Sequence, residues 1–377
     1  MGKKWEWAIV PFLFLLSSAF AQPIVIGAVV SQSGAHAAAA DHYGKALELW
    51  RDEVNARGGL LGRPVELRVR DDGSDAIKAG ELYAKLVAEK AHAFVGPFGS
   101  APALMANAEA EKAARVIVHG AAPATAVGKR SARYVFNAGP RNAAYGEAIL
   151  ELLGERKLRP FLLARDDATA REMAEGARDA AARLGLAPVE IALYKAGTSD
   201  FAPLVEKAKA AGADAWVAFG EVRDAADMAR TFRRLDYAPR LFYARAAMHP
   251  ELIKQIGQDA EHTLGALEYH PRLPTPGNRE FVAAFRGKWS VAPTAAAAQA
   301  YAAASFLAEG IRRANTVEAE KLRETLASLE HAGILPPGPA VAQIQNGRPE
   351  VVWPEALRTG GPLEPYPHWG ERRYLKK

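Results

Sequence analysis

A serine at the end of a glycine-containing loop is the residue of this chain best suited to hold an anion. Gly96-Pro97-Phe98-Gly99-Ser100 follows an apolar run at residues 93–95 and leads into a predicted helix over residues 101–112. Free backbone N–H groups at the first turn of a helix, together with a hydroxyl, can bind a carboxylate. The alternative is a plain N-cap, which any serine before a helix can provide. From the residues alone the cap is the simpler interpretation.

A second loop of small residues could approach a ligand closely with its backbone. Gly120-Ala121-Ala122-Pro123 follows a predicted strand over residues 116–118. The alternative is an ordinary exit from a strand into a loop. Both loops would lie at the carboxyl ends of strands, which is where open α/β sheets bind their ligands.

The other residue patterns favour no catalysis and no metal. His36 and His42 are close in the sequence, but no carboxylate or cysteine pattern joins them, so we expect His36 at the surface or lining a cleft. Asp71 and Asp72 are adjacent, which suits the end of a strand better than acid–base chemistry. The chain has no cysteine, no G-x-S-x-G or H-E-x-x-H motif and no phosphate-loop or dinucleotide fingerprint. We therefore expect no cofactor, no metal and no enzyme activity.

The elements that must position these loops are clearest in residues 43–75. Apolar residues at three- and four-residue spacing predict a helix that ends at Gly58-Gly59, where a left-handed cap costs little. Residues 65–70 then alternate between apolar and charged side chains, which predicts a strand. Asp75 can cap the next helix. This stretch is one α–β step of a layered α/β domain.

The same alternation continues in two blocks, before and after Asn137-Ala138-Gly139-Pro140. A chain of 377 residues is too long for one simple core, and βα alternation predicts parallel sheets with helices on both faces. After residue 275 the pattern changes to three helical stretches and a final strand pair that turns at Asn346-Gly347. We therefore expect two α/β lobes.

The first 21 residues have the pattern of an export signal. Lys3 and Lys4 precede an apolar run at residues 8–16, and Ala19-Phe20-Ala21 fits a cleavage site. The alternative is a membrane anchor, but the apolar run is short for a span. The formal net charge of +5 comes from basic residues interleaved with acidic ones, so we expect no nucleic-acid partner. The predicted product is a soluble periplasmic protein.

Two segments resemble the periplasmic solute-binding proteins of the branched-chain amino acid type, the receptors of ABC importers. NARGGLLGRPVELRVRDDGSD at residues 55–75 is similar to that family's first-lobe signature, and NGRPEVVWPEAL at residues 346–357 is similar to its closing segment. The resemblance extends from residue 24 to about residue 369. It implies the type I periplasmic-binding fold, with two doubly wound Rossmann-like α/β lobes whose parallel sheets are joined by a three-segment hinge.

The resemblance also implies where each lobe begins and ends. The expected division is residues 1–21 for the signal peptide, 22–138 plus 271–337 for the first lobe, 139–270 plus 338–357 for the second lobe and 358–377 for a C-terminal tail. The chain would cross between the lobes near residues 137–141, 269–273 and 336–341.

In the first lobe the resemblance favours the ligand interpretation of Ser100, because GPFGS is similar to the loop that binds a ligand carboxylate in that family. SQSGAHAAAA at residues 31–40 is similar to another ligand loop. In the family, the loop that corresponds to residues 120–123 often offers a hydroxyl to the ligand. In this chain that position is Pro123, or the hydroxyl is supplied by Thr125 instead. The implied first-lobe contacts are Ser33, Gly34, His36, Phe98, Ser100, Ala121 and Ala122.

In the second lobe the implied contacts are Thr169, Glu221 and Arg245, and two of these positions depart from the family pattern. Thr169 stands where a tyrosine is usual, and Arg245 stands where an acid or amide usually pairs with the ligand ammonium. A buried ammonium without a partner is costly. Either Glu221 therefore takes over this role, or the ligand has no ammonium, and Arg245 would favour a second negative group.

The resemblance predicts a receptor that captures an amino-acid-like or carboxylate-bearing solute and delivers it to an ABC importer permease in the inner membrane. A monomer suffices for that role. The alternatives are a ligand sensor on the same fold that signals to a membrane receptor, and an enzyme with an unrecognised site. The sequence leaves the ligand open, although the two departures argue against plain leucine, isoleucine or valine.

Overall fold

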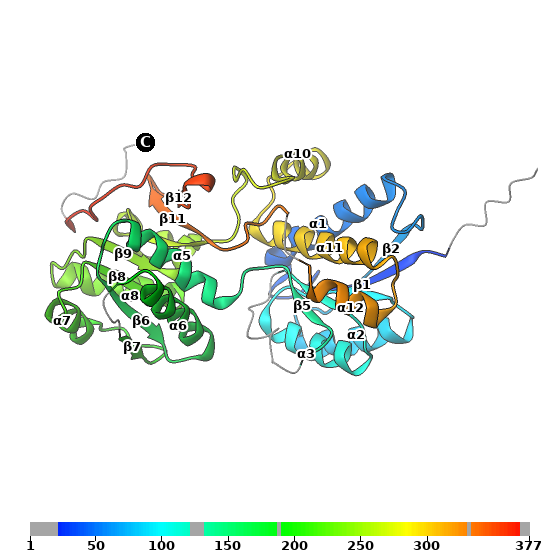
Figure 1. Ribbon diagram of the computed structural model, residues 1–377, viewed down its shortest axis with the longest axis horizontal. Helices are drawn as coiled ribbons and strands as arrows, with labels where there is room; N and C mark the ends of the chain where they lie inside the picture. Colours follow the sequence, from blue (N-terminus) through cyan, green and yellow to red (C-terminus); the bar gives the residue numbers. More distant parts are fainter. Residues whose placement is uncertain (1–21, 121–131, 187–189, 330–332, 370–377) are drawn as a thin grey trace, which may run out of the picture.

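The chain folds around two separate β-sheets. The structure is a computed structural model that describes residues 22–120, 132–186, 190–329 and 333–369. The predicted export signal, Ala121 and Ala122 therefore lie outside the described residues. Figure 1 shows two lobes side by side along the longest axis of the molecule.

The first lobe has a five-stranded parallel sheet in the order β2-β1-β3-β4-β5. Its strands are β1 (Ile24–Val30), β2 (Val65–Asp71), β3 (Ala93–Val95), β4 (Ile117–His119) and β5 (Val135–Asn137). Ile26 and Ala28 of β1 face one core while Val25 and Val29 face another, as the two-residue period of a strand requires. A run such as β1, apolar at every position, can be buried on both faces.

Helices cover both faces of this sheet. One face is covered by α1 (Ala37–Ala56), α10 (Asn278–Trp289), α11 (Ala295–Ala314) and α12 (Ala319–Ala327), and the other by α2 (Ala76–Ala88) and α3 (Ser100–Lys112). The alanines of α11 are small enough for it to pack closely on α1, and most of them are fully buried. Segments from before residue 138 and after residue 277 thus share one core.

The second lobe has a seven-stranded sheet in the order β12-β11-β10-β9-β8-β6-β7. Its strands are β6 (Pro160–Arg165), β7 (Ile191–Tyr194), β8 (Ala215–Phe219), β9 (Leu241–Ala244), β10 (Leu264–Leu267), β11 (Ala340–Gln345) and β12 (Arg348–Trp353). Strands β6 to β10 pair in parallel, whereas β11 and β12 add an antiparallel edge. The predicted turn joins β11 to β12, and both Asn346 and Gly347 have positive φ, as a tight hairpin needs.

Five α-helices of the described residues cover the second sheet. Helices α5 (Asn142–Glu155) and α6 (Ala168–Arg183) lie on one face, and α7 (Ala202–Ala210), α8 (Val222–Arg234) and α9 (Pro250–Ile256) lie on the other. The C-terminal segment packs on this lobe, where Tyr366 is buried against Phe242 and Trp369 donates to the Tyr237 carbonyl. Strand β5 and helix α9 were not predicted, because they have only three and seven residues, too few for a pattern to stand out.

The chain passes between the sheets three times, as expected for this fold. The connections run from β5 to α5, from β10 to α10 and from α12 to β11. None of the described helices is both long and apolar enough to cross a membrane.

Candidate functional site

The loop that contains Ser33, Gly34 and His36 is bonded to the loop that follows β2. The Ser33 hydroxyl donates to Asp71 Oδ2 at 2.6 Å, and Ser74 Oγ accepts from the backbone N–H of His36 at 2.9 Å. Gly34 has φ +83°, and a Cβ there would lie 2.3 Å from the Gly73 carbonyl oxygen. These residues are exposed, and their polar groups bind within the lobe.

Asp71 is the centre of this loop pair. Besides the Ser33 hydroxyl, its carboxylate accepts the backbone N–H groups of Gln32 at 2.9 Å, Ser33 at 3.2 Å and Gly73 at 2.9 Å. The bonds from the Ser33 hydroxyl and the Gly73 N–H lower the pKa of Asp71 to about 2. The acidic pair predicted to end a strand therefore does so, and Asp71 holds the neighbouring loop in place.

Ser100 is the first residue of α3 and not its N-cap, which corrects the simpler sequence interpretation. Gly99 occupies the cap position with φ 97°, and Ser100 is exposed. Phe98 is half-buried and contacts Tyr43, whose hydroxyl donates to the Gly96 carbonyl at 2.7 Å. The hydroxyl of Ser100 and the first N–H groups of α3 thus stand at the carboxyl end of β3, where a carboxylate could bind.

A buried histidine lies beneath this loop. His119, at the end of β4, is fully buried, and its Nε2 is 2.6 Å from Asn107 Oδ1 of α3. A Cβ at Gly96 would lie 2.0 Å from His119 Nδ1, so only glycine fits there. Burial lowers the pKa of His119 to about 3, which keeps the ring neutral. The histidine therefore packs between the Gly96 loop and α3.

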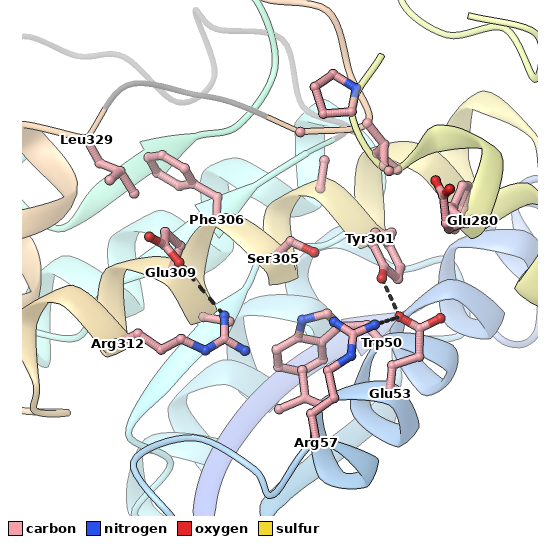
Figure 2. Close-up of a pocket in the computed structure, with 18 of the residues that line it drawn as sticks. Trp50, Glu53, Arg57, Glu280, Tyr301, Ser305, Phe306, Glu309, Arg312 and Leu329 are labelled. Carbon is pink, nitrogen blue, oxygen red and sulfur yellow. Dashed lines mark hydrogen bonds and ion pairs between the residues drawn. The ribbon is translucent and has the colours of Figure 1, made fainter. Parts of the chain in front are cut away.

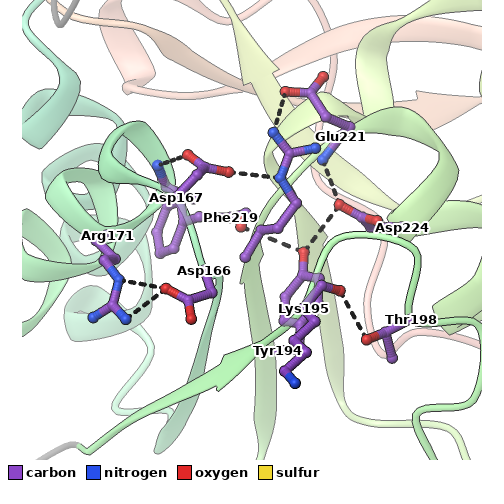
Figure 3. Close-up of polar contacts among 11 residues, drawn as sticks. Asp166, Asp167, Arg171, Tyr194, Lys195, Thr198, Phe219, Glu221 and Asp224 are labelled. Atoms are coloured by element: carbon purple, nitrogen blue, oxygen red, sulfur yellow. Dashed lines mark hydrogen bonds and ion pairs between the residues drawn. The ribbon is translucent and has the colours of Figure 1, made fainter.

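In the second lobe, polar side chains from three strand ends form a network (Figure 3). Arg165 donates to Asp167 at 2.6 Å and lies 3.5 Å from Glu221. Tyr194 donates to Asp224, whose carboxylate accepts the backbone N–H of Glu221 at 2.8 Å. The carboxyl edge of β6, β7 and β8 is thus fixed by internal hydrogen bonds.

Thr169 lies in the first turn of α6 and is half-buried. Asp167 caps this helix by accepting the backbone N–H of Ala170 at 2.9 Å. Thr169 does not line the second-lobe pocket that contains Glu221 and Arg245.

A pocket of about 360 Å³ opens beside this network and contains both of the charged second-lobe candidates. Its apolar lining comes from Val222, Ala246, Met248, Ala266, Leu267 and Ala295, the last of which begins α11 of the first lobe. Its polar lining comes from Tyr145, Glu221, Arg245, His249, Glu268 and Tyr269. The pocket therefore lies where the second crossing leaves the second lobe.

Four polar residues of this pocket were not predicted, and two of them, Tyr145 and Glu268, bind each other. The Tyr145 hydroxyl of α5 donates to one oxygen of Glu268, and the Gln299 side-chain amide of α11 donates to the other. Burial, and then the charge of Glu268, raise the pKa of Tyr145 far above its usual range, so that its hydroxyl stays a donor. Glu268 directly follows the apolar strand β10, and an acid at a strand end is the signal that could have singled it out.

Arg245 lies on the other side of Tyr145. Its guanidinium carbon is 5.8 Å from the centre of the Tyr145 ring, which is a cation–π contact. In the parts of the chain that the structure describes, no carboxylate lies within ion-pair distance of this guanidinium. A half-buried cation in a pocket without an anionic partner is suited to bind an anion.

The largest pocket among those described, about 770 Å³, lies elsewhere on the first lobe (Figure 2). It runs between α1 and α11, with Trp50 at its base, and none of the predicted ligand residues lines it. Its charges pair with one another: Arg57 with Glu53 at 3.2 Å and Arg313 with Glu309 at 2.7 Å. It is a groove between packed helices, and these ion pairs neutralise the charges of the side chains that form them.

The structure thus brings Glu221 and Arg245 together, and adds Tyr145 and Glu268 to them. It places Ser33, Gly34, His36, Phe98 and Ser100 on the first lobe, and none of these five lines the second-lobe pocket. Ala121 and Ala122 lie outside the described residues. Over those described, no cluster of three histidine, aspartate or glutamate side chains could hold a metal ion.

Comparisons with known proteins agree with this architecture. Over 327 residues the chain is 24% identical to a Leu/Ile/Val-binding protein homolog of Brucella melitensis, covering 81% of each chain. Over 313 residues it is 25% identical to an amino acid binding protein of Pseudomonas aeruginosa, covering 81% of this chain and 82% of that one.

Solved structures share the fold at lower sequence identity. An ABC transporter substrate-binding protein of Desulfitobacterium hafniense in complex with leucine matches 88% of this chain and all of its own, at a TM-score of 0.71 and 20% identity. A branched-chain amino acid transporter substrate binding protein of Streptococcus pneumoniae in complex with isoleucine matches with the same coverage, at a TM-score of 0.65 and 22% identity. The family model described as periplasmic binding protein matches residues 23–352, and the chain belongs to this family.

Proposed function

We propose that this protein is a receptor that captures a small amino-acid-like or carboxylate-bearing solute between its two lobes and delivers it to an ABC importer in the inner membrane. The observation that carries the proposal is the second-lobe pocket, where the guanidinium of Arg245, which has no ion pair among the described residues, lies over Tyr145, and Tyr145 donates to Glu268. Family membership supports solute capture, and relatives with binding and transport names support the role in import. Those names give no support to the sensor alternative.

Capture would proceed by closure about the three crossings. The pocket adjoins the second crossing, and the loop of Phe98 and Ser100 stands at the strand edge of the first lobe. In this proposal, Ser100 and the first N–H groups of α3 bind one end of the solute, with Ala121, Ala122 and the Ser33–His36 loop around it. Hinge closure of this kind is common in two-lobed binding proteins.

The proposal includes the remaining expectations from the sequence. The first 21 residues direct export and are removed, and the mature protein acts in the periplasm as a monomer without catalysis. The lobe limits at residues 138, 270 and 337, with the tail from residue 358, belong to the same proposal.

Thermal unfolding of the mature chain against amino acids, other carboxylates and small amides tests solute capture. A ligand at one hundred times its dissociation constant should add about 2.7 kcal/mol, which raises the melting temperature by roughly 5–10 °C for lobes of this size. Small-angle X-ray scattering with the same ligand should show a smaller radius of gyration. Stabilisation without compaction would contradict closure, and no stabilisation by any member of these classes would contradict capture.

A further inference from the structure

A side-chain hydrogen bond joins the two lobes beside the second-lobe pocket. Gln299 belongs to α11 of the first lobe, and its amide donates to Glu268, which directly follows β10 of the second lobe. Figure 1 shows the start of α11 facing the second lobe, and Ala295 at that start lines the pocket. Helix α11 therefore reaches this pocket from the first lobe.

Each partner of this hydrogen bond is held by its own lobe. The Tyr145 hydroxyl of α5 donates to the other oxygen of Glu268, and Tyr145 is only 7% exposed. On the first-lobe side, a Cβ at Gly120 would lie 1.9 Å from the Gln299 carbonyl oxygen, so α11 packs directly on the backbone that follows β4. Because neither partner can follow the other, a rotation of one lobe about the other changes the distance between them.

The hydrogen bond is present in an arrangement that is open at the ligand edges. None of the described first-lobe candidates, such as Ser33, Phe98 and Ser100, lines the second-lobe pocket. Closure over a solute must bring these residues to the pocket by rotating the first lobe, and α11 rotates with it. A hydrogen bond is lost once its donor and acceptor move beyond about 3.2–3.5 Å.

We infer that the Gln299–Glu268 hydrogen bond is a latch that holds the lobes open and breaks when they close over a solute. This inference deepens the proposed function and rests on its closure step. The apparent dissociation constant of a receptor rises as the fraction of molecules in the competent state falls. The latch therefore weakens capture, and Gln299 is a positioning residue that acts on the lobes through Glu268.

The first test measures lobe separation in the full mature chain without any solute. The chain has no cysteine, so Glu81→Cys on α2 and Glu175→Cys on α6, both exposed, place one spin label on each lobe. Pulsed electron paramagnetic resonance then gives the distances between the labels. Gln299→Leu removes the amide at similar size and should raise the ratio of closed to open molecules by about 10-fold to 150-fold, the range for losing a hydrogen bond to a charged acceptor.

A second variant and a control separate the latch from damage to the fold. Gln299→Ala, in a helix already rich in alanine, should shift the distances in the same direction. Gln255→Leu makes the same change as Gln299→Leu at an exposed position of α9 and should leave the distances unaltered.

The second test is isothermal titration calorimetry with α-amino acids and with aliphatic and aromatic carboxylates. Each compound that binds the wild type should bind both Gln299 variants about 10-fold more tightly or better, whereas damage to the fold would weaken binding. Unaltered label distances in both variants, or weaker binding by both, would overturn the latch and leave solute capture standing. Binding of no compound by the wild type or the variants would contradict capture, and the label distances would still decide whether the latch exists.

Discussion

The ligand edges of the two lobes use their polar residues differently. In the first lobe, Ser33 and Asp71 bind each other, and Gly34 packs against the Gly73 carbonyl. In the second lobe, Arg245 lines a pocket and forms no ion pair among the described residues, and the Glu268 carboxylate accepts hydrogen bonds from two neutral donors. The polar groups of the first edge are therefore bonded within their own lobe, and we propose that the charges of the second edge distinguish one solute from another.

We therefore expect the polar residues of the first-lobe edge to contribute mainly to stability and those of the second-lobe pocket mainly to ligand specificity. Substitutions in the first-lobe edge should lower the free energy of unfolding, whereas substitutions of the pocket charges should change binding and leave stability nearly unaltered.

Gly34→Ala should have the largest effect, lowering the free energy of unfolding by about 3 kcal/mol or more. The alanine would meet the Gly73 carbonyl at 2.3 Å in addition to the strain of φ +83°. Denaturant titration measures the change. Gly58→Ala is the matched control, because its φ is +92° and nothing lies within 4 Å of the added Cβ, so that about 1–2 kcal/mol of strain alone is expected. Equal costs at the two positions would show that the Ser33 loop is not a rigid frame.

His119 should make stability depend on pH. Its folded pKa of about 3 lies below the value of 6.5 for the free side chain, so below pH 6.5 the unfolded chain binds a proton that the folded chain does not. Stability is lost as the pH falls, by about 2 kcal/mol between pH 7 and pH 5 from this residue alone. Denaturant titrations at the two pH values of the wild type and of His119→Gln isolate its share. The same pH dependence in both proteins would contradict the neutral buried ring.

Asp71→Asn should cost about 1–2 kcal/mol at pH 7, because an amide cannot accept all the hydrogen bonds that the carboxylate accepts. The folded pKa of about 2 lies below the usual 3.8, so the charge of Asp71 stabilises the fold above pH 4, and this contribution disappears as the pH falls through 2. The difference in melting temperature between wild type and variant should therefore shrink from pH 4 to pH 2. A constant difference over that range would assign the cost to packing and not to charge.

Arg245→Gln should have the smallest effect on stability, within about 0.5 kcal/mol of the wild type without ligand. The guanidinium makes a cation–π contact with Tyr145 but no ion pair among the described residues, so little is lost when it is removed. Thermal unfolding without ligand measures this change. A loss of several kcal/mol would show that Arg245 holds the fold together and would end the contrast between the two edges.

Much of the fold could be predicted from local patterns. Residues 43–75 gave a helix, a glycine turn and a strand where the structure has α1 and β2, because apolar spacing and glycine positions act over a few neighbours. The elements β5 and α9 were missed because they are too short for such a local pattern to show. The candidate site was predicted only in part: Glu221 and Arg245 do share a pocket, but Tyr145 and Glu268 had no motif.

The sequence by itself determined the α/β alternation, the turns at glycines and the resemblance to a two-lobed receptor, since these depend on residues that are near one another in the chain. Only the tertiary structure decided which polar and charged side chains come into contact at the second-lobe pocket. Residues 145, 245 and 268 come from three separate elements, and Gln299 reaches Glu268 from the other lobe. Their contact depends on strand order and on how α11 packs near the crossing, and no local pattern of residues encodes that arrangement.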